Sequence, residues 1–280
     1  MQDENQTSRI LATKRFGVFA EIRTGPRVAT TLPRHLHEEL QIILSEKRLI
    51  SYGIRGTQVL SPLRSVFVVE PEVPHSGHVH KFQSEWGVLR TFLIPQSSFT
   101  HHLGQQIQQS SLTFASPVLT PRVLLNRLRL MHDALTGDQD DLESESVVSA
   151  TLSMILSLVK TPPAKTFRRR SDAKMRLVRD FLGDNPARQT SLSQLAASVD
   201  LSPFHVLREF RLQYGMSPHA FRIQLRVGKA RDLLLAKVPI SEAALLSGFS
   251  DHAHLTRTFH KIVGVPPSRF QKAISFKTGR

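Results

Sequence analysis

Cysteine is absent from this chain of 280 residues. Disulfide bonds, thiolate metal sites and thiol redox chemistry are therefore excluded, although 13 histidines leave metal binding through imidazole and carboxylate groups open. Long apolar runs are missing as well. No segment approaches the roughly 18 to 20 apolar residues that a membrane-spanning helix needs, and residues 1–9 are polar. We expect a cytoplasmic protein with no membrane partner.

Recognisable enzyme motifs are also missing. The chain has no phosphate-binding glycine-rich loop, no nucleophile elbow and no zinc-binding helix motif. We therefore expect a protein that is not an enzyme, has no catalytic residues and carries no cofactor.

Acidic residues are scarce in the C-terminal part. Residues 161–280 contain 21 Lys and Arg but only 8 Asp and Glu, a net charge of +13, whereas the first 160 residues carry +1. Such a basic block is typical of domains that bind nucleic acid, because Lys and Arg that neutralise phosphates release counterions. Solubility and anionic membrane surfaces are alternative explanations for the charge.

Strand-like segments fill the first part of the chain. Short apolar runs at residues 17–22, 40–44, 65–69 and 88–94 are separated by glycine and proline turns. Since no helical pattern lies between them, they predict an antiparallel barrel or sandwich rather than alternating strands and helices.

Helical periodicity follows from residue 117 onward. Leu124, Leu128 and Leu135 recur at helical intervals, and a second helix fits residues 142–159. The short polar loop between them predicts an antiparallel pair. Its apolar stripes either pack on the barrel or form the seam of a dimer.

Four parts follow from these patterns. We expect a barrel over residues 1–115, a helical pair over 116–160, an exposed linker rich in Pro and Arg over 161–172, and a helical domain over 173–280. The fold class is thus α+β with two domains, in which an antiparallel β-barrel and its helical pair precede an all-α domain.

The basic block contains an internal repeat. Six residues recur as similar residues 49 positions later within a span of sixteen, which is hard to attribute to chance. Val206, Arg208, Phe210, Gly215, Pro218 and Phe221 correspond in this way to Leu255, Arg257, Phe259, Gly264, Pro267 and Phe270. Upstream, where Leu192 corresponds to Ile240, the offset is 48, so the copies differ in length by one residue.

Each copy has the pattern of a helix-turn-helix. Residues 192–198 predict the first helix, and Asp200 lies in the turn, where the second copy has Gly248. Asp tolerates a left-handed backbone better than most residues, and Gly tolerates it best. Ser202 and Ser250 are expected to cap the helices that follow. These following helices are the candidate recognition helices.

Helical spacing assigns each recognition helix an outer face. Val206 and Phe210 are expected in the core, as are Leu255 and Phe259 in the second copy. The residues expected to contact DNA are Phe204, Leu207, Arg208, Arg211, His252, Ala253, Thr256 and Arg257. The alternative for Arg208 and Arg257 is a solvated or ion-paired arginine. A structural role is favoured for His205 and His254.

One helix is expected to join the copies. Residues 218–236 have apolar residues at helical spacing and no internal proline. At 1.5 Å per residue, such a helix is about 28 Å long. This length is close to the roughly 34 Å between successive major-groove faces on one side of DNA. Two recognition helices on one chain would then enter adjacent grooves.

The repeat resembles the AraC/XylS family of transcription regulators. The resemblance lies in residues 201–218, in Arg226 with residues 230–234, and in residues 248–259 with 264–267. It implies two helix-turn-helix units that bind asymmetric sites on double-stranded DNA, with RNA polymerase as a candidate partner. Asp200 replaces a glycine usual in the family, and residues 252–254 replace small polar residues.

The N-terminal part resembles the cupin-like sensing domain of the same family. The matching segments are residues 32–42 and 69–75. The resemblance implies a small-molecule effector in the barrel and regulation through a homodimer.

Three histidines are candidate effector-binding residues. His35 and His37 are two residues apart, so on a strand they point to the same face, and His75 can join them. Cupin enzymes bind a metal with such a set and a glutamate shortly after the histidine pair, where this chain has Gln41. We expect effector-binding or structural histidines and no metal.

Two further function classes remain as alternatives. A cupin-type metalloenzyme with an accessory basic domain that binds nucleic acid would contain stoichiometric Fe, Mn or Zn. A nonspecific chromosome-organising protein would bind DNA without sequence preference, which two different exposed recognition faces argue against. A DNA-binding regulator would instead show a steep salt dependence of affinity.

Overall fold

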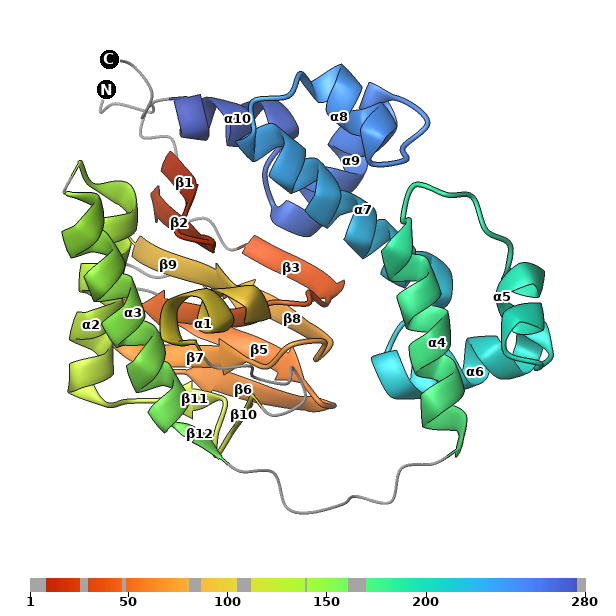
Figure 1. The fold of residues 1–280 in the computed structure, drawn as a ribbon, viewed down its shortest axis with the longest axis horizontal. Helices are drawn as coiled ribbons and strands as arrows, with labels where there is room; N and C mark the ends of the chain where they lie inside the picture. The colour runs from red at the N-terminus through yellow and green to blue at the C-terminus, as the bar shows by residue number, and fades with distance from the viewer. Residues whose placement is uncertain are drawn as a thin grey trace. The chain divides into compact units, whose positions relative to one another are not determined.

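The computed structural model describes residues 9–25, 30–46, 49–80, 87–104, 112–138, 140–160 and 170–275. Figure 1 shows strands in the first part of the chain and helices in the last part. The chain divides into two compact units, the first of Met1–Thr31, Glu38–Pro162 and Lys272–Arg280, and the second of Leu32–His37 and Pro163–Gln271. In the described part, no helix has both the length and the apolar character needed to cross a membrane.

The first unit contains antiparallel strands, as expected from the four apolar runs. One sheet has the order β1 (Arg9–Arg15), β2 (Val18–Gly25), β9 (Gly87–Ile94), β4 (Leu40–Ser45), β7 (Ser65–Val69) and β11 (Val118–Leu119). The order of a second sheet is β3 (Thr30–His35), β8 (His75–Val79), β5 (Ile50–Ile54) and β6 (Thr57–Ser61). A two-stranded ladder joins β10 (Thr113–Phe114) to β12 (Val159–Lys160).

Both faces of the six-stranded sheet are buried. On β4, Ile42 and Leu44 belong to one apolar cluster and Ile43, which points to the opposite face, belongs to another. The second cluster includes Tyr52 of β5, whose ring stacks on Phe67 of β7 with centroids 3.6 Å apart. Because both faces are covered, the central strands are continuous apolar runs in the sequence. The fold is a cupin-like barrel.

Among its described residues, the first unit also contains the helices α1 (Gln96–Leu103), α2 (Arg122–Thr136) and α3 (Asp141–Ser157). The apolar stripes of α2 and α3, including Leu128 and Leu152, belong to the same buried cluster as Ile42 and Phe92 of the sheet. The stripes therefore pack on the barrel, the first of the two expected alternatives. The expected helix over residues 142–159 is too long, because α3 ends at Ser157 and Val159 pairs with Phe114 in the β10–β12 ladder.

Apart from Leu32–His37, which include the end of β3, the second unit is helical. Its helices are α4 (Arg170–Asp184), α5 (Leu192–Ser198), α6 (Pro203–Tyr214), α7 (Pro218–Leu235), α8 (Ile240–Leu246), α9 (His252–Val263) and α10 (Pro267–Ser275). The linker expected over residues 161–172 is partly corrected. Residues 161–169 lie outside the described residues, and α4 already begins at Arg170.

The sequence repeat is a repeat of structure. Helices α5 and α8 have 7 residues each, and α6 and α9 have 12 each. Each of the longer helices ends at a glycine in the left-handed conformation, Gly215 with φ 67° and Gly264 with φ 85°. The turns before them are also left-handed, at Asp200 with φ 51° and Gly248 with φ 88°. Both turns therefore form as expected.

Candidate nucleic-acid interface

Helix α6 begins at the residues that the sequence indicates. Ser202 is the N-cap, and its hydroxyl accepts a hydrogen bond from the backbone N–H of His205 at 3.3 Å. Pro203 occupies the first turn, where a missing N–H costs nothing. The His205 ring contacts the same Ser202 hydroxyl through Nδ1 at 3.0 Å. This contact supports the structural role favoured for His205.

The core and outer faces of α6 are divided as expected except at Leu207. Val206 and Phe210 are fully buried, and Phe210 packs edge-on against Phe221 of α7 with ring centroids 5.5 Å apart. Phe204, Arg208 and Arg211 are exposed, whereas Leu207 is half-buried. At 69% exposure, Phe204 is a large aromatic side chain with no place in the core of this unit. Such a residue is available for apolar contact with a thymine methyl group.

Arg208 is ion-paired with its sequence neighbour. Its Nη2 and Nε donate to a carboxylate oxygen of Glu209 at 2.8 Å and 3.0 Å. The side chain remains 55% exposed. A solvated pair of this kind contributes roughly 0 to 1 kcal/mol, so it does not prevent the guanidinium from binding a phosphate or a guanine.

Helix α9 differs from the expectation at its first residue. Its N-cap is Asp251, not Ser250, and a carboxylate oxygen of Asp251 accepts from the backbone N–H of His254 at 2.7 Å. This hydrogen bond, aided by the Ser250 hydroxyl, lowers the pKa of Asp251. Ser250 also contacts His254 Nδ1 at 3.2 Å, so His254, like His205, has a structural contact near the cap.

Three of the four expected DNA-contacting residues on α9 are exposed. These are His252, Ala253 and Arg257, while Leu255 and Phe259 are fully buried. Thr256 departs from the expectation, because it is half-buried and its hydroxyl oxygen is buried.

Two arginines of α7 hold backbone carbonyl groups, a structural role that the sequence did not predict. Arg226 is buried and donates from Nε to the carbonyl oxygen of Pro186 at 2.7 Å. Arg222, one turn earlier, donates from Nη1 to the carbonyl oxygen of Thr190 at 3.1 Å. The signal for Arg226 is its spacing of four residues from the buried Ala230, which places it on the buried side of the helix.

The three effector-site histidines lie on the strands of the four-stranded sheet or directly after them. His35 ends β3, His37 follows it, and His75 begins β8. Each of these side chains offers a ring nitrogen within 4.8 Å of the others. The role of the three residues in effector binding stays a prediction.

Hydrogen bonds orient two of the three rings. Nδ1 of His35 donates to the carbonyl oxygen of Pro33 at 2.8 Å, and Nδ1 of His75 donates to that of Val73 at 3.0 Å. A neutral ring held in this way has an unprotonated Nε2. The set can accept hydrogen bonds from a ligand. A tetrahedral zinc site would need its nitrogens about 3.3 Å apart, as zinc–nitrogen bonds of 2.0–2.1 Å require.

A second group of potential ligands is already engaged. His101, His102 and Glu145 also gather within 4.8 Å. Both nitrogens of His102 are in hydrogen bonds, Nδ1 with the Ser149 hydroxyl at 3.1 Å and Nε2 with the Phe16 carbonyl at 2.9 Å. An imidazole whose two nitrogens are both in hydrogen bonds has no lone pair left for a metal. This group is therefore a structural contact between α1 and α3.

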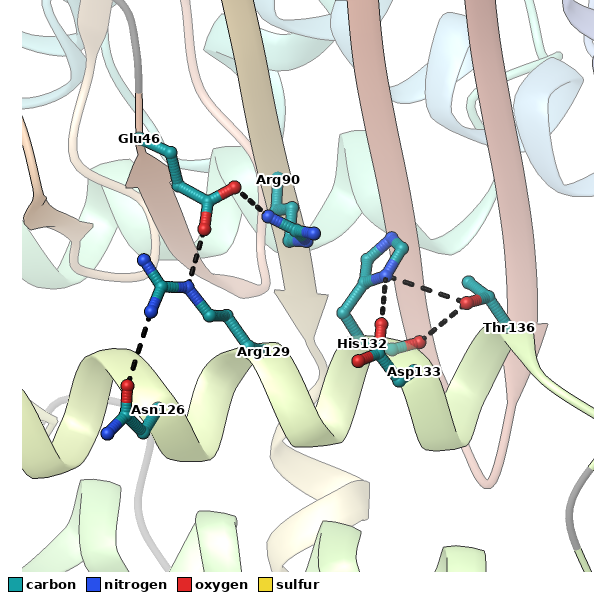
Figure 2. Close-up of polar contacts among 7 residues, drawn as sticks. All are labelled: Glu46, Arg90, Asn126, Arg129, His132, Asp133 and Thr136. Atoms are coloured by element: carbon teal, nitrogen blue, oxygen red, sulfur yellow. Dashed lines mark hydrogen bonds and ion pairs between the residues drawn. The ribbon is translucent and has the colours of Figure 1, made fainter.

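An ion cluster joins the barrel sheet to α2, as Figure 2 shows. Glu46, directly after β4, accepts from Arg90 of β9 and from Nε of Arg129 on α2 at 2.5 Å. Nη1 of Arg129 also donates to Asn126 at 3.2 Å. One carboxylate is therefore the shared acceptor of two guanidinium groups from different elements. The sequence has no local signal for this cluster, because its members are far apart in the chain.

Two family models match the chain. The model of the AraC-like ligand binding domain matches residues 17–152, and that of the helix-turn-helix domain matches residues 195–273. The first range runs from β2 through part of α3, and the second runs from within α5 into α10, so it includes both candidate recognition helices. The chain belongs to the AraC/XylS family.

Proteins similar in sequence to this chain carry the names of regulators. The chain is 25% identical over 263 residues to the probable transcriptional regulator LumQ of Photobacterium leiognathi, covering 90% of this chain and 98% of LumQ. It is 34% identical over 91 residues to the regulator MtrA of Neisseria gonorrhoeae, which covers 32% of this chain and spans only 30% of the length of MtrA. These names give no support to the metalloenzyme alternative.

A solved structure has the same fold throughout. ToxT of Vibrio cholerae, crystallised with an unsaturated fatty acid bound, superposes with a TM-score of 0.65 at 12% identity and full coverage of both chains. The similarity confirms the fold, a barrel domain followed in the chain by a helical domain.

Proposed function

We propose that this chain is a transcription regulator that binds specific sites on double-stranded DNA and responds to an effector in its barrel. The observation that carries the proposal is the matched pair of helix-turn-helix units. Arg208 on α6 and Arg257 on α9 occupy equivalent positions, and both are exposed. Arginine in a major groove makes bidentate contacts to guanine. The net charge of +13 in residues 161–280 supplies the sequence-independent attraction to phosphates.

The contact set that we propose for DNA is the outer face of both recognition helices. Phe204, Leu207, Arg208 and Arg211 form it on α6, and His252, Ala253, Thr256 and Arg257 form it on α9. The half-buried Leu207 and Thr256 would contribute apolar contacts at the edges of these faces. The remaining residues would contact bases or phosphates directly.

We also propose the division of labour along the chain. Residues 1–115 sense the effector, residues 116–160 form a dimer contact, and the helical domain from α4 (Arg170–Asp184) onward binds DNA. Support for a homodimer comes from Val123 and Leu130, which are seven residues apart on one side of α2 and are 60% and 52% exposed. RNA polymerase is the proposed partner if DNA binding activates transcription, and the proposed location is the cytoplasm.

The proposed effector site is the histidine set of His35, His37 and His75. A buried polar atom on β4 also suits a polar ligand, because the side-chain oxygen of Gln41 is buried and accepts no hydrogen bond in the described part of the chain. Gln41 is opposite Val69 in the sheet, and Val69 belongs to the apolar cluster of Tyr52. ToxT was crystallised with an unsaturated fatty acid, so amphipathic carboxylates are the first class to screen.

The test of DNA binding is selection followed by a salt titration. Duplexes with about 25 random base pairs would be enriched on the full chain, and the affinity of a selected duplex measured between about 50 and 200 mM salt. Six to ten phosphate contacts predict a loss of about 10³ to 10⁵ in affinity across this range. Enrichment of no common sequence would favour nonspecific DNA binding instead. Stoichiometric metal in the purified protein, with loss of an activity on chelation, would favour the metalloenzyme.

A further inference from the structure

Arg226 lies where the two helix-turn-helix units meet. It is on α7, the helix that joins the units, and it is only 7% exposed. Its Nε donates to the carbonyl oxygen of Pro186 at 2.7 Å, and its Nη2 donates to that of Ala187 at 3.2 Å. Both carbonyls belong to the loop between α4 and α5. The guanidinium group therefore attaches the joining helix to the first helix-turn-helix unit through two neighbouring peptides.

The second helix-turn-helix unit contacts the same loop through Gly248. A Cβ atom at Gly248 would lie 2.5 Å from the Cα of Ala187 and 3.0 Å from Nε of Arg226. The first of these neighbours is backbone, so it cannot move aside as the end of a flexible side chain can. Gly248 also has a φ of 88°, which favours glycine. The turn between α8 and α9 thus packs directly on the loop between α4 and α5.

The first helix-turn-helix unit provides a comparison for the turn at Gly248. Asp200 is the counterpart of Gly248 and is also left-handed, with a φ of 51°. It carries a side chain, so the conformation alone does not require glycine at this turn. The additional requirement at Gly248 is the close approach of Ala187. The two copies therefore differ at the point where one unit meets the other.

Arginine is suited to this position by its geometry. The planar guanidinium presents several N–H donors in a fixed fork, which can bond two carbonyl oxygens at once, whereas a lysine ammonium is a single point charge. Arg222 extends the contact by donating to the carbonyl oxygen of Thr190 at 3.1 Å. Two arginines one turn apart on α7 thus hold the loop along most of its length.

We infer that Arg226 and Gly248 are positioning residues, which fix the angle and separation of the recognition helices α6 and α9. We call Arg226, Pro186, Ala187 and Gly248 together the Arg226 joint. The joint makes the two units one rigid body in the free protein. The consequence for binding rests on the proposed function, because it requires both units to contact one duplex. A rigid pair tolerates only one spacing between its two DNA elements.

The first experiment measures the rigidity without DNA. Because the chain has no cysteine, Ser193→Cys and Ser241→Cys introduce unique attachment points for spin labels at equivalent, exposed positions of α5 and α8. Pulsed dipolar spectroscopy on the full chain should give one narrow distance distribution. Arg226→Gln should broaden it, and Arg226→Lys should broaden it less. Gly248→Ala should shift its mean, whereas Asp200→Ala, the matched control in the first unit, should leave it unchanged.

The inference is overturned if Arg226→Gln unfolds cooperatively and keeps the parental width. Should that variant fail to fold, Arg226→Lys and Gly248→Ala decide by the same comparison with Asp200→Ala. An unchanged distribution in both would mean that α7 alone orients the units.

The second experiment measures the consequence on DNA. One base pair inserted between the two elements of a selected duplex moves them apart by about 3.4 Å and rotates them by about 34°. The parental protein should lose about tenfold or more in affinity, as when base contacts are lost. Arg226→Lys should bind the original duplex more weakly but lose much less on insertion. A merely structural role would weaken both duplexes equally, which would refute the positioning role.

The two experiments separate the inference from the proposed function. If the free protein gives a narrow distribution that Arg226→Gln broadens, the joint exists. If the parental protein is then indifferent to the inserted base pair, the proposal that both units bind one duplex is wrong.

Discussion

Arg208 of α6 and Arg257 of α9 occupy equivalent positions in the two helix-turn-helix copies, and both side chains are exposed. They lie two residues after the buried Val206 and Leu255, so the core fixes which side of each helix they are on. Charge, exposure and position together make these two residues the strongest candidates for base recognition in the chain.

Removing either arginine should weaken binding to a selected duplex. We expect Arg208→Ala and Arg257→Ala each to cost about 1 to 3 kcal/mol in binding free energy and to relax base preference at one element. The measurement is fluorescence anisotropy on the selected duplex and on duplexes with single substitutions. Lys229→Ala, at an exposed position on α7, is the control and should affect all duplexes alike. Unchanged discrimination in both arginine variants would show that the recognition faces are assigned wrongly.

The cap of α6 should contribute measurably to stability. The Ser202 hydroxyl satisfies the backbone N–H of His205, which has no partner inside the helix. We expect Ser202→Ala to lower the free energy of unfolding by about 1 kcal/mol. Urea denaturation measures this change, with Ser193→Ala at an exposed position of α5 as the control. Equal stability of the two variants would mean that the cap is not formed in solution.

The stability of the helical domain should depend on pH through His219 of α7. Burial and the nearby Arg222 and Arg226 lower the pKa of His219 below its usual 6.5. Between the lowered value and 6.5 the unfolded chain binds the proton and the folded chain does not, so the free energy of unfolding falls as pH decreases below 6.5. Urea midpoints at about pH 5 and pH 7.5 should therefore differ less in His219→Gln than in the parent. The same difference in both proteins would contradict this assignment.

Glu46 should stabilise the attachment of α2 to the barrel. Its carboxylate is the shared acceptor of Arg90 and Arg129 (Figure 2), and its side chain is only 15% exposed. Glu46→Gln leaves the guanidinium groups without a counter-charge, so we expect a loss of about 1 to 3 kcal/mol in the free energy of unfolding.

The matched control for Glu46 is the ion pair of Arg55 with Glu70. Arg55 is 62% exposed, so Arg55→Gln should cost at most about 1 kcal/mol. Urea denaturation compares the two variants. A larger loss from Arg55→Gln than from Glu46→Gln would contradict the role given to the Glu46 cluster.

Much of the fold follows from local patterns. The strand runs, the two helix-turn-helix copies and the left-handed turns at Asp200 and Gly248 are all visible in the sequence, because periodicity and turn chemistry are local properties. Helix ends are harder to predict. Ser250 and Asp251 are both good N-caps, and only the backbone course decides that Asp251 takes the position.

Contacts between distant segments could not be predicted from the sequence. Arg226 is recognisable as a buried-side residue of α7, but its acceptors are carbonyl groups 40 and 39 residues earlier. Every residue has a carbonyl group, so the sequence does not show which of them will accept. The same holds for Glu46, whose partners come from β9 and α2. The histidine set was predictable because alternate positions on a strand share a face, which identifies His35 and His37 before the fold is known.

The most direct test of the whole account is a guanine-protection footprint of the full chain on a selected duplex. Two protected major-groove elements about one helical turn apart are expected. Arg208→Ala should remove protection at one element, and Arg257→Ala should remove it at the other. A single protected element, or protection that neither variant changes, would contradict the claim that α6 and α9 bind adjacent grooves.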